Sequence, residues 1–347
     1  MNQLLPFSCD YLQGCHPAIL AKLAETNMEA CEGYGSDPYT VRAKQLILEA
    51  CHLEDGEVQL ISGGTQANLI VIAAALQRYQ AVISADTGHI NCHEAGSIEA
   101  TGHKILALPH HQGKISAQQV DEYMKIFTAD ANNEHMAQPA LVYISQPTEY
   151  GTLYSAGELR KLHEVCQKYG LLLYADGARL AYGLASSRND VTLPLMAECC
   201  DIFYIGGTKC GALLGEAVVF RRKGLVPHFF TTVKQMGGIL AKGKLLGIQF
   251  ATLFEDDLYL KVGTSAISYA DQIQDFLKAN GYQLLFDSPT NQIFVIMEND
   301  RLRKLGEKVS YSFWEKYDDS HTVIRLATSW ATQQADVDRL LSILKEI

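Results

Sequence analysis

The sequence predicts an α/β protein built on a mostly parallel β-sheet with helices on both faces. Short, nearly continuous apolar segments alternate with amphipathic ones as far as about Phe220, which is typical of parallel strands buried on both sides. The 347 residues exceed what one ordinary core holds, and the pattern changes after about Phe250. We therefore expect an α/β fold in two parts. The first is an N-terminal arm with a large domain over residues 1–250, and the second a smaller α+β domain over residues 251–347.

The elements of the large domain follow from helix-starting residues and apolar runs. Pro17 predicts the first turn of a helix over residues 16–26, and Asp37 before Pro38 predicts a helix that runs to about Cys51. Strands and helices then alternate. The expected strands are 58–61, 81–85, 104–108, 140–145, 171–176, 201–205 and 216–220, and the expected helices are 65–78, 94–101, 116–128 and 155–169.

The C-terminal part has a different pattern. A long helical stretch over residues 253–280 is followed by an apolar strand at 291–297 and a helix near Arg301. A strand at 323–328 and a final helix at 334–345 complete it. This order of elements predicts a small α+β unit.

Composition and charge exclude several classes of partner. Lys and Arg number 29 and Asp and Glu 39, so the net charge of −10 disfavours nucleic acids and anionic membranes. The nine cysteines show no C-x-x-C spacing, so we expect reduced thiols.

The segment from Met1 to Pro6 lacks the features of a signal peptide, and no apolar run is long enough to span a bilayer. We expect a cytoplasmic protein.

Lys209 is the strongest candidate for a catalytic residue. It follows the apolar strand at 201–205 and lies among small residues, and Asp176 ends the strand at 171–176. An amine and a carboxylate at the ends of two strands suit pyridoxal phosphate, because the lysine forms a Schiff base with the aldehyde and the acid pairs with the protonated ring nitrogen. For Lys209 considered alone, an ordinary surface lysine is the alternative.

The segment Ser62-Gly63-Gly64-Thr65 predicts a phosphate site. It joins a strand to a helix, so its glycines allow close backbone approach and the first helical N–H groups point at the ligand. The segment is neither G-x-G-x-x-G nor a Walker loop, which disfavours dinucleotides and nucleoside triphosphates. An ordinary strand–helix turn is the alternative.

His89 and His93 would share a helix face, which raises the alternative of a metal site. No third ligand appears at a recognisable spacing, so we predict no metal. We interpret His93 as a structural residue, whereas a flat imidazole in this segment could stack on a cofactor ring.

Two arginines are candidates to hold a substrate carboxylate. Arg179 lies three residues after Asp176, and Arg325 lies in the apolar strand at 323–328, where a guanidinium needs an anion. Structural salt bridges are the alternative for both.

Taken together, these segments resemble the low-specificity threonine aldolases, the β-eliminating lyase family of fold type I pyridoxal-phosphate enzymes. The similarity covers nearly the whole chain. Each matching segment is weak alone, but their order is specific. The segments are Cys9-Asp10, His16-Pro17, 33–40, 64–68, His89, 94–96, 146–149, 176–179, 206–209 and 325–330.

The resemblance implies a role for each matching residue. Lys209 matches the Schiff-base lysine, Asp176 the partner of the pyridine nitrogen, and His89 the ring-stacking histidine that is a candidate to handle the β-hydroxyl proton. The backbone of Gly64 and Thr65 matches the segment that holds the phosphate, and Arg179 and Arg325 match the carboxylate clamp, with Arg179 also beside the coenzyme. Lys244, with Lys242, matches a basic residue that reaches the phosphate from a neighbouring subunit. Tyr34 lies in a segment that borders the site.

Two positions depart from the family pattern. Cys9 stands where many members have a serine that contacts the substrate carboxylate. Glu149 stands where one branch has a histidine near the β-hydroxyl, although a bacterial branch resembles this chain. Both changes concern the substrate, so the expectation for the coenzyme is unaffected.

We therefore expect an aldolase that cleaves threonine or allo-threonine to glycine and acetaldehyde, as a homodimer or homotetramer with shared active sites. Another pyridoxal-phosphate β-eliminating lyase or an aminotransferase is the first alternative. A non-catalytic coenzyme-binding protein of this fold is a second, disfavoured because no basic patch is visible. A nicotinamide-dependent oxidoreductase would need the missing dinucleotide glycine pattern.

Overall fold

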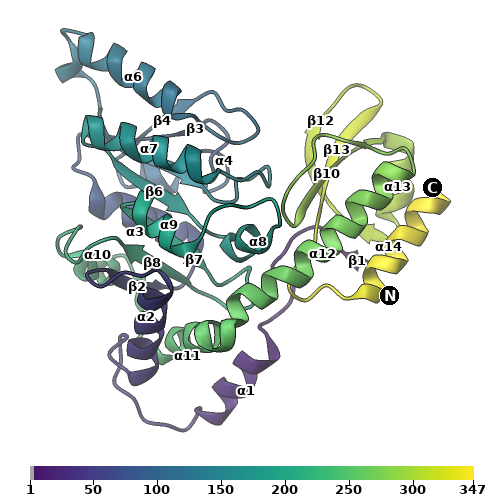
Figure 1. Ribbon diagram of the computed structural model, residues 1–347, viewed down its shortest axis with the longest axis horizontal. Helices are drawn as coiled ribbons and strands as arrows, with labels where there is room; N and C mark the ends of the chain where they lie inside the picture. The colour runs from purple at the N-terminus through teal and green to yellow at the C-terminus, as the bar shows by residue number, and fades with distance from the viewer. Residues whose placement is uncertain (1–3) are drawn as a thin grey trace.

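A computed structural model describes residues 4–347 of the chain (Figure 1). Met1 to Gln3, part of the segment in which no signal peptide is expected, lie outside the described residues. The chain forms a large unit around a seven-stranded sheet and a small unit around a four-stranded sheet. A long helix, α12 (Leu258–Ala279), runs from one to the other (Figure 1). No helix within residues 4–347 is both long and apolar enough to cross a membrane.

The large sheet consists of β2 (Glu57–Ile61), β3 (Gln80–Ala85), β4 (Lys104–Leu108), β5 (Gln138–Ser145), β6 (Leu172–Asp176), β7 (Ile202–Gly206) and β8 (Glu216–Phe220). Its order is β2-β8-β7-β6-β5-β3-β4. The pairs from β7 to β4 are all parallel, whereas β8 runs antiparallel to both of its neighbours. Each strand coincides with a predicted one to within two residues. The mostly parallel sheet predicted from the sequence is thus confirmed.

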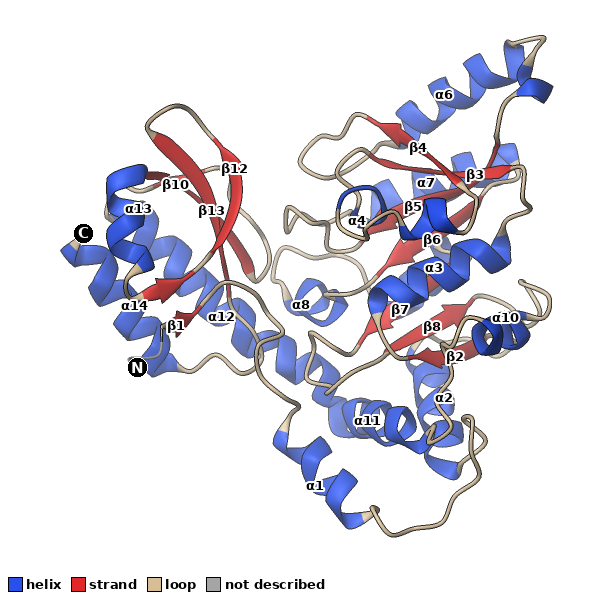
Figure 2. Cartoon of the chain, turned by 180° about the vertical axis from the view of Figure 1, so that it is seen from behind, coloured by secondary structure: helices blue, strands red, loops and turns tan. Residues whose placement is uncertain are grey.

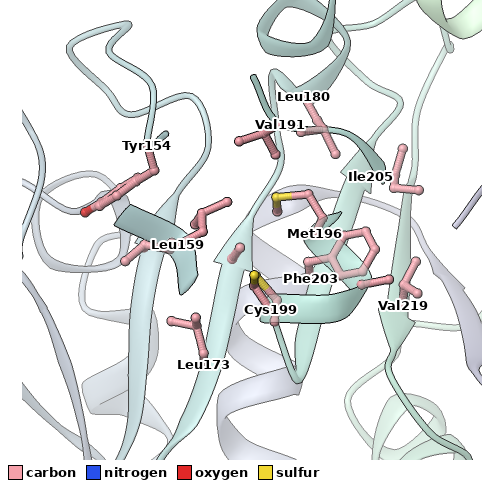
Figure 3. Close-up of a cluster of buried hydrophobic side chains, with 14 of the residues drawn as sticks. Tyr154, Leu159, Leu173, Leu180, Val191, Met196, Cys199, Phe203, Ile205 and Val219 are labelled. Atoms are coloured by element: carbon pink, nitrogen blue, oxygen red, sulfur yellow. The ribbon is translucent and has the colours of Figure 1, made fainter. Parts of the chain in front are cut away.

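Helices cover both faces of this sheet because its strands are apolar on both sides. On β7, Phe203 and Ile205 face one apolar cluster, whereas Ile202 and Tyr204 face another. The first face carries α6 (Ala117–Ala129), α7 (Ala156–Tyr169) and α9 (Leu193–Cys199), and the second carries α3 (Gly64–Ala75) and α10 (Phe229–Gln235) (Figures 1 and 2). Figure 3 shows part of the first cluster, where Met196 of α9 lies beside Phe203.

Most helices begin where the sequence predicts. In α1 (Pro17–Glu25) and α2 (Pro38–Ala50) the first residue is the expected proline, and Asp37 accepts a hydrogen bond from Thr40 N at 2.8 Å. Ser116 and Ser155 start α6 and α7 with capping boxes. The short helix α8 (Leu180–Ala185), with α9 and α10, is not predicted because so few turns give no clear period.

The helix predicted over residues 94–101 is wrong in position. Two short helices form instead, α4 (His89–Cys92) and α5 (Ser97–Ala100). Between them Ala95 and Gly96 have φ angles of 52° and 73°, in the left-handed region, so no single helix can pass through.

The small unit contains β9 (Gln283–Leu284), β10 (Gln292–Glu298), β12 (Ser312–Lys316) and β13 (His321–Ala327), antiparallel in the order β12-β13-β10-β9. The helices α12, α13 (Asn299–Gly306) and α14 (Gln334–Glu346) flank this four-stranded sheet (Figure 1). In the arm, β1 (Leu5–Pro6) pairs with β11 (Val309–Ser310), and Phe7 is buried in the core of this unit. The first strand of the arm therefore lies with the small unit, and the division at residue 250 stays a prediction.

Close packing of α2 against α11 (Lys244–Phe254) leaves no room for a side chain at Gly247. A Cβ atom there would overlap the backbone nitrogen of Thr40, whereas at Gly157 in α7 the nearest atom would lie 4.0 Å away. We expect Gly247→Ala to lower the free energy of unfolding by about 1–3 kcal/mol through overpacking. Gly157→Ala should leave it unchanged or raise it by up to about 1 kcal/mol. Urea denaturation of both variants measures the difference, and equal stabilities would contradict the expectation.

Candidate active site

The candidate residues gather at the carboxyl ends of the parallel strands. β3 leads to His89, β5 to Glu149, β6 ends at Asp176, and β7 leads to Lys209. Since parallel strands end at one edge, these segments border a common region, where a cavity of about 480 Å³ lies. Its walls also include parts of the arm and of β12 in the small unit. The lining residues are Tyr11, Thr87, His89, Cys92, His93, Glu149, Tyr150, Arg179, Lys209, Ser312, Phe313, Trp314, Glu315 and Arg325.

Asp176 is a buried carboxylate surrounded by hydrogen-bond donors. Its Oδ2 accepts from Asn68 Nδ2 at 2.9 Å and from the Tyr143 hydroxyl at 2.7 Å. Its Oδ1 accepts from the Tyr204 hydroxyl. Burial by itself would raise the pKa of Asp176, but the charge of His89 and these hydrogen bonds outweigh burial and lower it. Asp176 does not line the cavity itself, but it is a fixed anion at the same edge of the sheet.

Asn68 links Asp176 to a second buried carboxylate, Glu94. Its Nδ2 also donates to Glu94 Oε1 at 2.7 Å, and the Tyr174 hydroxyl donates to its Oδ1 at 2.8 Å. His89 Nδ1 lies 2.8 Å from the same Glu94 oxygen, which acts as an acceptor, so Nδ1 carries a proton. Burial would lower the pKa of His89, but the hydrogen bond to Glu94 and the charge of Asp176 outweigh it and raise the pKa. Glu94 thus holds the His89 ring in one orientation and favours its protonated form.

Lys209 is half-buried and reaches the cavity from the segment after β7. Burial and the neighbouring charge of Arg179 lower the pKa of Lys209, against the opposite effect of Asp10. A lowered pKa increases the fraction of neutral amine, the form that attacks a carbonyl carbon. Glu216 on β8 shares this environment, and burial raises its pKa to about 7.

Arg179 and Arg325 line the same cavity but have different partners. Arg179 donates through Nε and Nη2 to the two oxygens of Asp10, at 2.6 and 3.0 Å, so it forms a structural salt bridge. Arg325 instead donates to neutral oxygens, Gln292 Oε1 at 3.0 Å and Ser8 O at 3.2 Å. Its buried Nε has no hydrogen-bond partner among the described residues. Arg325 is therefore the guanidinium that still lacks a carboxylate.

The predicted phosphate segment lies at the same edge of the sheet. The helix α3 begins at Gly64, directly after β2, and Gly63 is its N-cap. A Cβ atom at Gly64 would lie 3.1 Å from the hydroxyl of Tyr204, the tyrosine that donates to Asp176. Gly64 and Thr65 do not line the cavity described above. Their backbone N–H groups nevertheless start a helix whose next turn carries Asn68, so an anion there would lie on the Asp176 side of the site.

Three other predicted residues lie outside the cavity wall of the single chain. Cys9 is half-buried in the arm, and Tyr34 is 46% exposed. Lys244 Nζ donates to the backbone oxygens of Thr26 and Glu29, at 2.9 and 2.7 Å. Their roles in substrate or phosphate binding stay predictions.

A metal site is the remaining alternative from the sequence. Within residues 4–347, no group of three or more His, Cys, Asp and Glu side chains is arranged to hold a metal ion. The rings of His89 and His93 lie 5.7 Å apart, and His89 Nδ1 faces Glu94.

Sequence reasoning missed several residues around the site. Tyr143 and Tyr204 are buried on apolar strands, and a buried tyrosine hydroxyl needs a partner, so their sequence context carried a signal. Asp10 and Glu94 were noted only as parts of longer motifs. Trp314 comes from β12, a strand with no continuous apolar run, and nothing in its local sequence places it at the cavity.

Comparison with known proteins adds independent findings. The family profile described as beta-eliminating lyase matches residues 7–300. The low specificity L-threonine aldolase of Pseudomonas aeruginosa is 27% identical over 344 residues, covering 98% of this chain and 96% of that protein. A solved structure of Leishmania major threonine aldolase has a TM-score of 0.95 and 40% identity, with 98% of both chains covered. A PLP-bound putative aminotransferase of Clostridium difficile, with a TM-score of 0.73 and 12% identity over 99% of this chain and 92% of that one, shares the fold alone.

The ion pair of Asp10 with Arg179 gives a test of what the arm contributes. Asp10 is fully buried and also accepts from Asn291 Nδ2 at 2.9 Å. Asp10→Ala would leave the Arg179 charge buried and unpaired, so we expect the free energy of unfolding to fall by about 3–5 kcal/mol. The double variant Asp10→Ala, Arg179→Met should recover part of this loss.

The same pair has a pH dependence. Burial opposes ionisation of Asp10, but the charge of Arg179 outweighs it and lowers the pKa to about 2 from the ordinary 3.8. The stabilisation should be complete above the ordinary value and disappear as the pH falls through about 2. Urea denaturation of the apoprotein at neutral and acidic pH measures both effects, and an Asp10→Ala variant as stable as the parent at neutral pH would contradict them.

Proposed function

The chain belongs to the beta-eliminating lyase family, and from this premise we propose that it is a pyridoxal-phosphate-dependent aldolase. Its substrates are β-hydroxy-α-amino acids, with L-threonine or L-allo-threonine giving glycine and acetaldehyde. The likeness to the threonine aldolases of Leishmania major and Pseudomonas aeruginosa, over nearly the full length of each chain, supports this proposal. The observation that carries it is the ionised, buried Asp176 at the same sheet edge as the lowered-pKa amine of Lys209.

The residues present fit this coenzyme at each of its polar ends. Asp176 is the anion that a protonated pyridine nitrogen needs, Lys209 is the amine for the aldehyde, and the first turn of α3 offers its N–H groups to the phosphate. The ring of His89, fixed by Glu94, is available for stacking. When bound, pyridoxal phosphate accepts electron density from a bond that breaks at the substrate Cα.

The protein's own side chains orient the substrate. Arg325 lines the cavity and has only neutral hydrogen-bond partners, so it is the guanidinium that binds the α-carboxylate, and the positive charge of Arg179 strengthens the field at that wall. With the substrate amino group at the coenzyme position that Lys209 would otherwise occupy, two attachment points would fix the rotation about Cα and so select the bond to the β-carbon for cleavage. Cys9 lies beside this wall in the arm and can add a contact to the carboxylate.

We further propose that the enzyme is a cytoplasmic homo-oligomer, either a dimer or a tetramer. Tyr34 and Lys244 lie away from the cavity of their own chain, which is consistent with a role at a neighbouring subunit's site. All nine cysteines are free, which supports a reducing compartment.

The direct test of the function is the pair of wild type and Lys209→Ala. We expect wild-type protein reconstituted with pyridoxal phosphate to release acetaldehyde and glycine from L-threonine or L-allo-threonine, and to retain coenzyme covalently after borohydride reduction. Lys209→Ala removes the amine, so covalent retention should disappear and aldehyde release should fall by at least about 1,000-fold. Exposed Lys161→Ala is the matched control. Pyruvate with ammonia, or a keto acid, as the product would instead identify another lyase or an aminotransferase.

Arg325 gives a second test, directed at the substrate and not the coenzyme. Because a charge-assisted contact is worth about 1.5–3 kcal/mol, Arg325→Ala should raise the KM for threonine by roughly 10- to 150-fold. Coenzyme affinity, measured by absorbance titration of the apoprotein, should be unchanged. Arg325→Lys should recover part of the loss, and Arg339→Ala on the exposed face of α14 serves as the control. A variant that loses coenzyme but binds substrate normally would show that Arg325 has another role.

A further inference from the structure

Glu149 occupies a position in the cavity that its role as a substrate contact does not explain. It follows β5, is only 8% exposed, and lines the cavity together with Lys209 and Arg325. Its Oε1 accepts hydrogen bonds from Ser145 Oγ at 2.6 Å and from the backbone N–H of His89 at 3.0 Å. Both recorded hydrogen bonds fall on this one oxygen, which leaves Oε2 for the cavity.

The segment that carries Glu149 is held from two sides. The hydroxyls of Thr148 and Thr152 lie 2.7 Å apart and close the turn on itself. From the small unit, Thr290 Oγ1 donates to Gly151 O at 2.8 Å. A carboxylate on a fixed loop keeps its geometry, which a proton-transfer group needs because its reach is short.

The other cavity groups are less suited to accept a proton from the substrate. His89 Nδ1 donates to Glu94, which holds the ring in one orientation, and the raised pKa of His89 favours its protonated form. His93 also lines the cavity, but its side chain is exposed. Partial burial of the ring and the charge of His89 lower the pKa of His93. Among the described residues that line the cavity, Glu149 is the buried carboxylate.

The surroundings of Glu149 make it a stronger base than an ordinary carboxylate. Burial raises the pKa of Glu149, and the hydrogen bond from Ser145 only partly opposes this. A base whose pKa lies closer to the working pH transfers protons more effectively. The titratable and charged groups that influence it, or that it influences, are His89 and Cys92 of the α4 segment, Tyr143 of β5, Tyr154, Asp176 of β6, and Arg179.

We infer that Glu149, and not His89, takes the proton from the β-hydroxyl of the substrate; this inference rests on the proposed aldolase function. With the carboxylate at Arg325 and the amino group in the position that the Lys209 amine would otherwise occupy, the remaining wall of the cavity presents Glu149 to the β-substituent. The O–H bond breaks and its proton passes to Glu149 Oε2, while the oxygen forms the carbonyl of the aldehyde. The Cα–Cβ bond breaks, its electron pair stays with Cα, and Cα later takes up one proton to give glycine. His89 remains a positioning residue.

The first test compares two reactions of the same holoenzyme. Aldehyde release from threonine needs the β-hydroxyl proton to leave, whereas exchange of the glycine α-proton with deuterated solvent does not. We expect Glu149→Gln to slow aldehyde release by at least about 100-fold, the lower range for a lost general base, and to leave glycine exchange within a few-fold of wild type. Glu164→Gln, at an exposed position of α7, is the matched control.

The second test uses pH. Glu149 must be ionised to accept a proton, so the turnover of wild type should fall as the pH drops through its raised pKa. Because the Ser145 hydrogen bond lowers that pKa, Ser145→Ala should shift this acidic limb to higher pH, and Glu149→Gln should abolish it. The difference between infrared spectra of substrate-free wild-type and Glu149→Gln holoenzyme should contain a protonated carboxyl band, since the band of Glu216 is common to both. Its midpoint should match the acidic limb of kcat/KM.

The outcomes separate the two proposals. Wild-type holoenzyme that exchanges the glycine proton but releases no aldehyde from any β-hydroxy amino acid would overturn the proposed function itself. Active wild type with Glu149→Gln near normal, or with both reactions lost equally, would overturn only the inference about Glu149. The inference about Glu149 would also be overturned if His93→Asn, and not Glu149→Gln, removes the acidic limb of the pH profile.

Discussion

The structure depends on keeping Asp176 ionised in a place that water does not reach. A buried carboxylate without partners would take up a proton, because burial penalises the charged form. Here its oxygens receive hydrogen bonds from Asn68 on α3, Tyr143 on β5 and Tyr204 on β7. One side chain therefore links three elements of the large unit by hydrogen bonds. The anion that these hydrogen bonds stabilise is the partner that an electron-accepting pyridinium ring requires.

The same network orients its neighbours. Asn68 uses one amide nitrogen to bridge Asp176 and Glu94, and Glu94 in turn orients His89. The hydrogen bond to Glu94 and the charge of Asp176 raise the pKa of His89, which favours its protonated form. His89 is therefore held as a positioning ring, and Glu149 is the cavity carboxylate placed to accept a proton from the substrate.

The substrate end of the cavity is built differently, from parts that the chain brings together over long distances. The arm contributes Asp10, which occupies the fork of Arg179, and β13 of the small unit contributes Arg325. The small unit also fixes the loop of Glu149 through Thr290. Coenzyme-side residues therefore come from the large sheet, whereas substrate-side residues depend on how the arm and the small unit pack against it.

The amino-acid sequence alone located the strands of the large sheet, since each contains a short apolar run and all but the edge strand β4 are mostly buried. It also placed Lys209 and Asp176 at strand ends, because residues after parallel strands share one edge. Which charges pair depends instead on the tertiary structure. Arg179 finds its carboxylate 169 positions away, and the partners of Asp176 include Asn68 at a separation of 108. The local sequence pattern predicts which residues are buried and where turns occur. Hydrogen bonds and ion pairs between distant segments depend on how whole helices and strands pack, and this packing cannot be predicted from a local pattern.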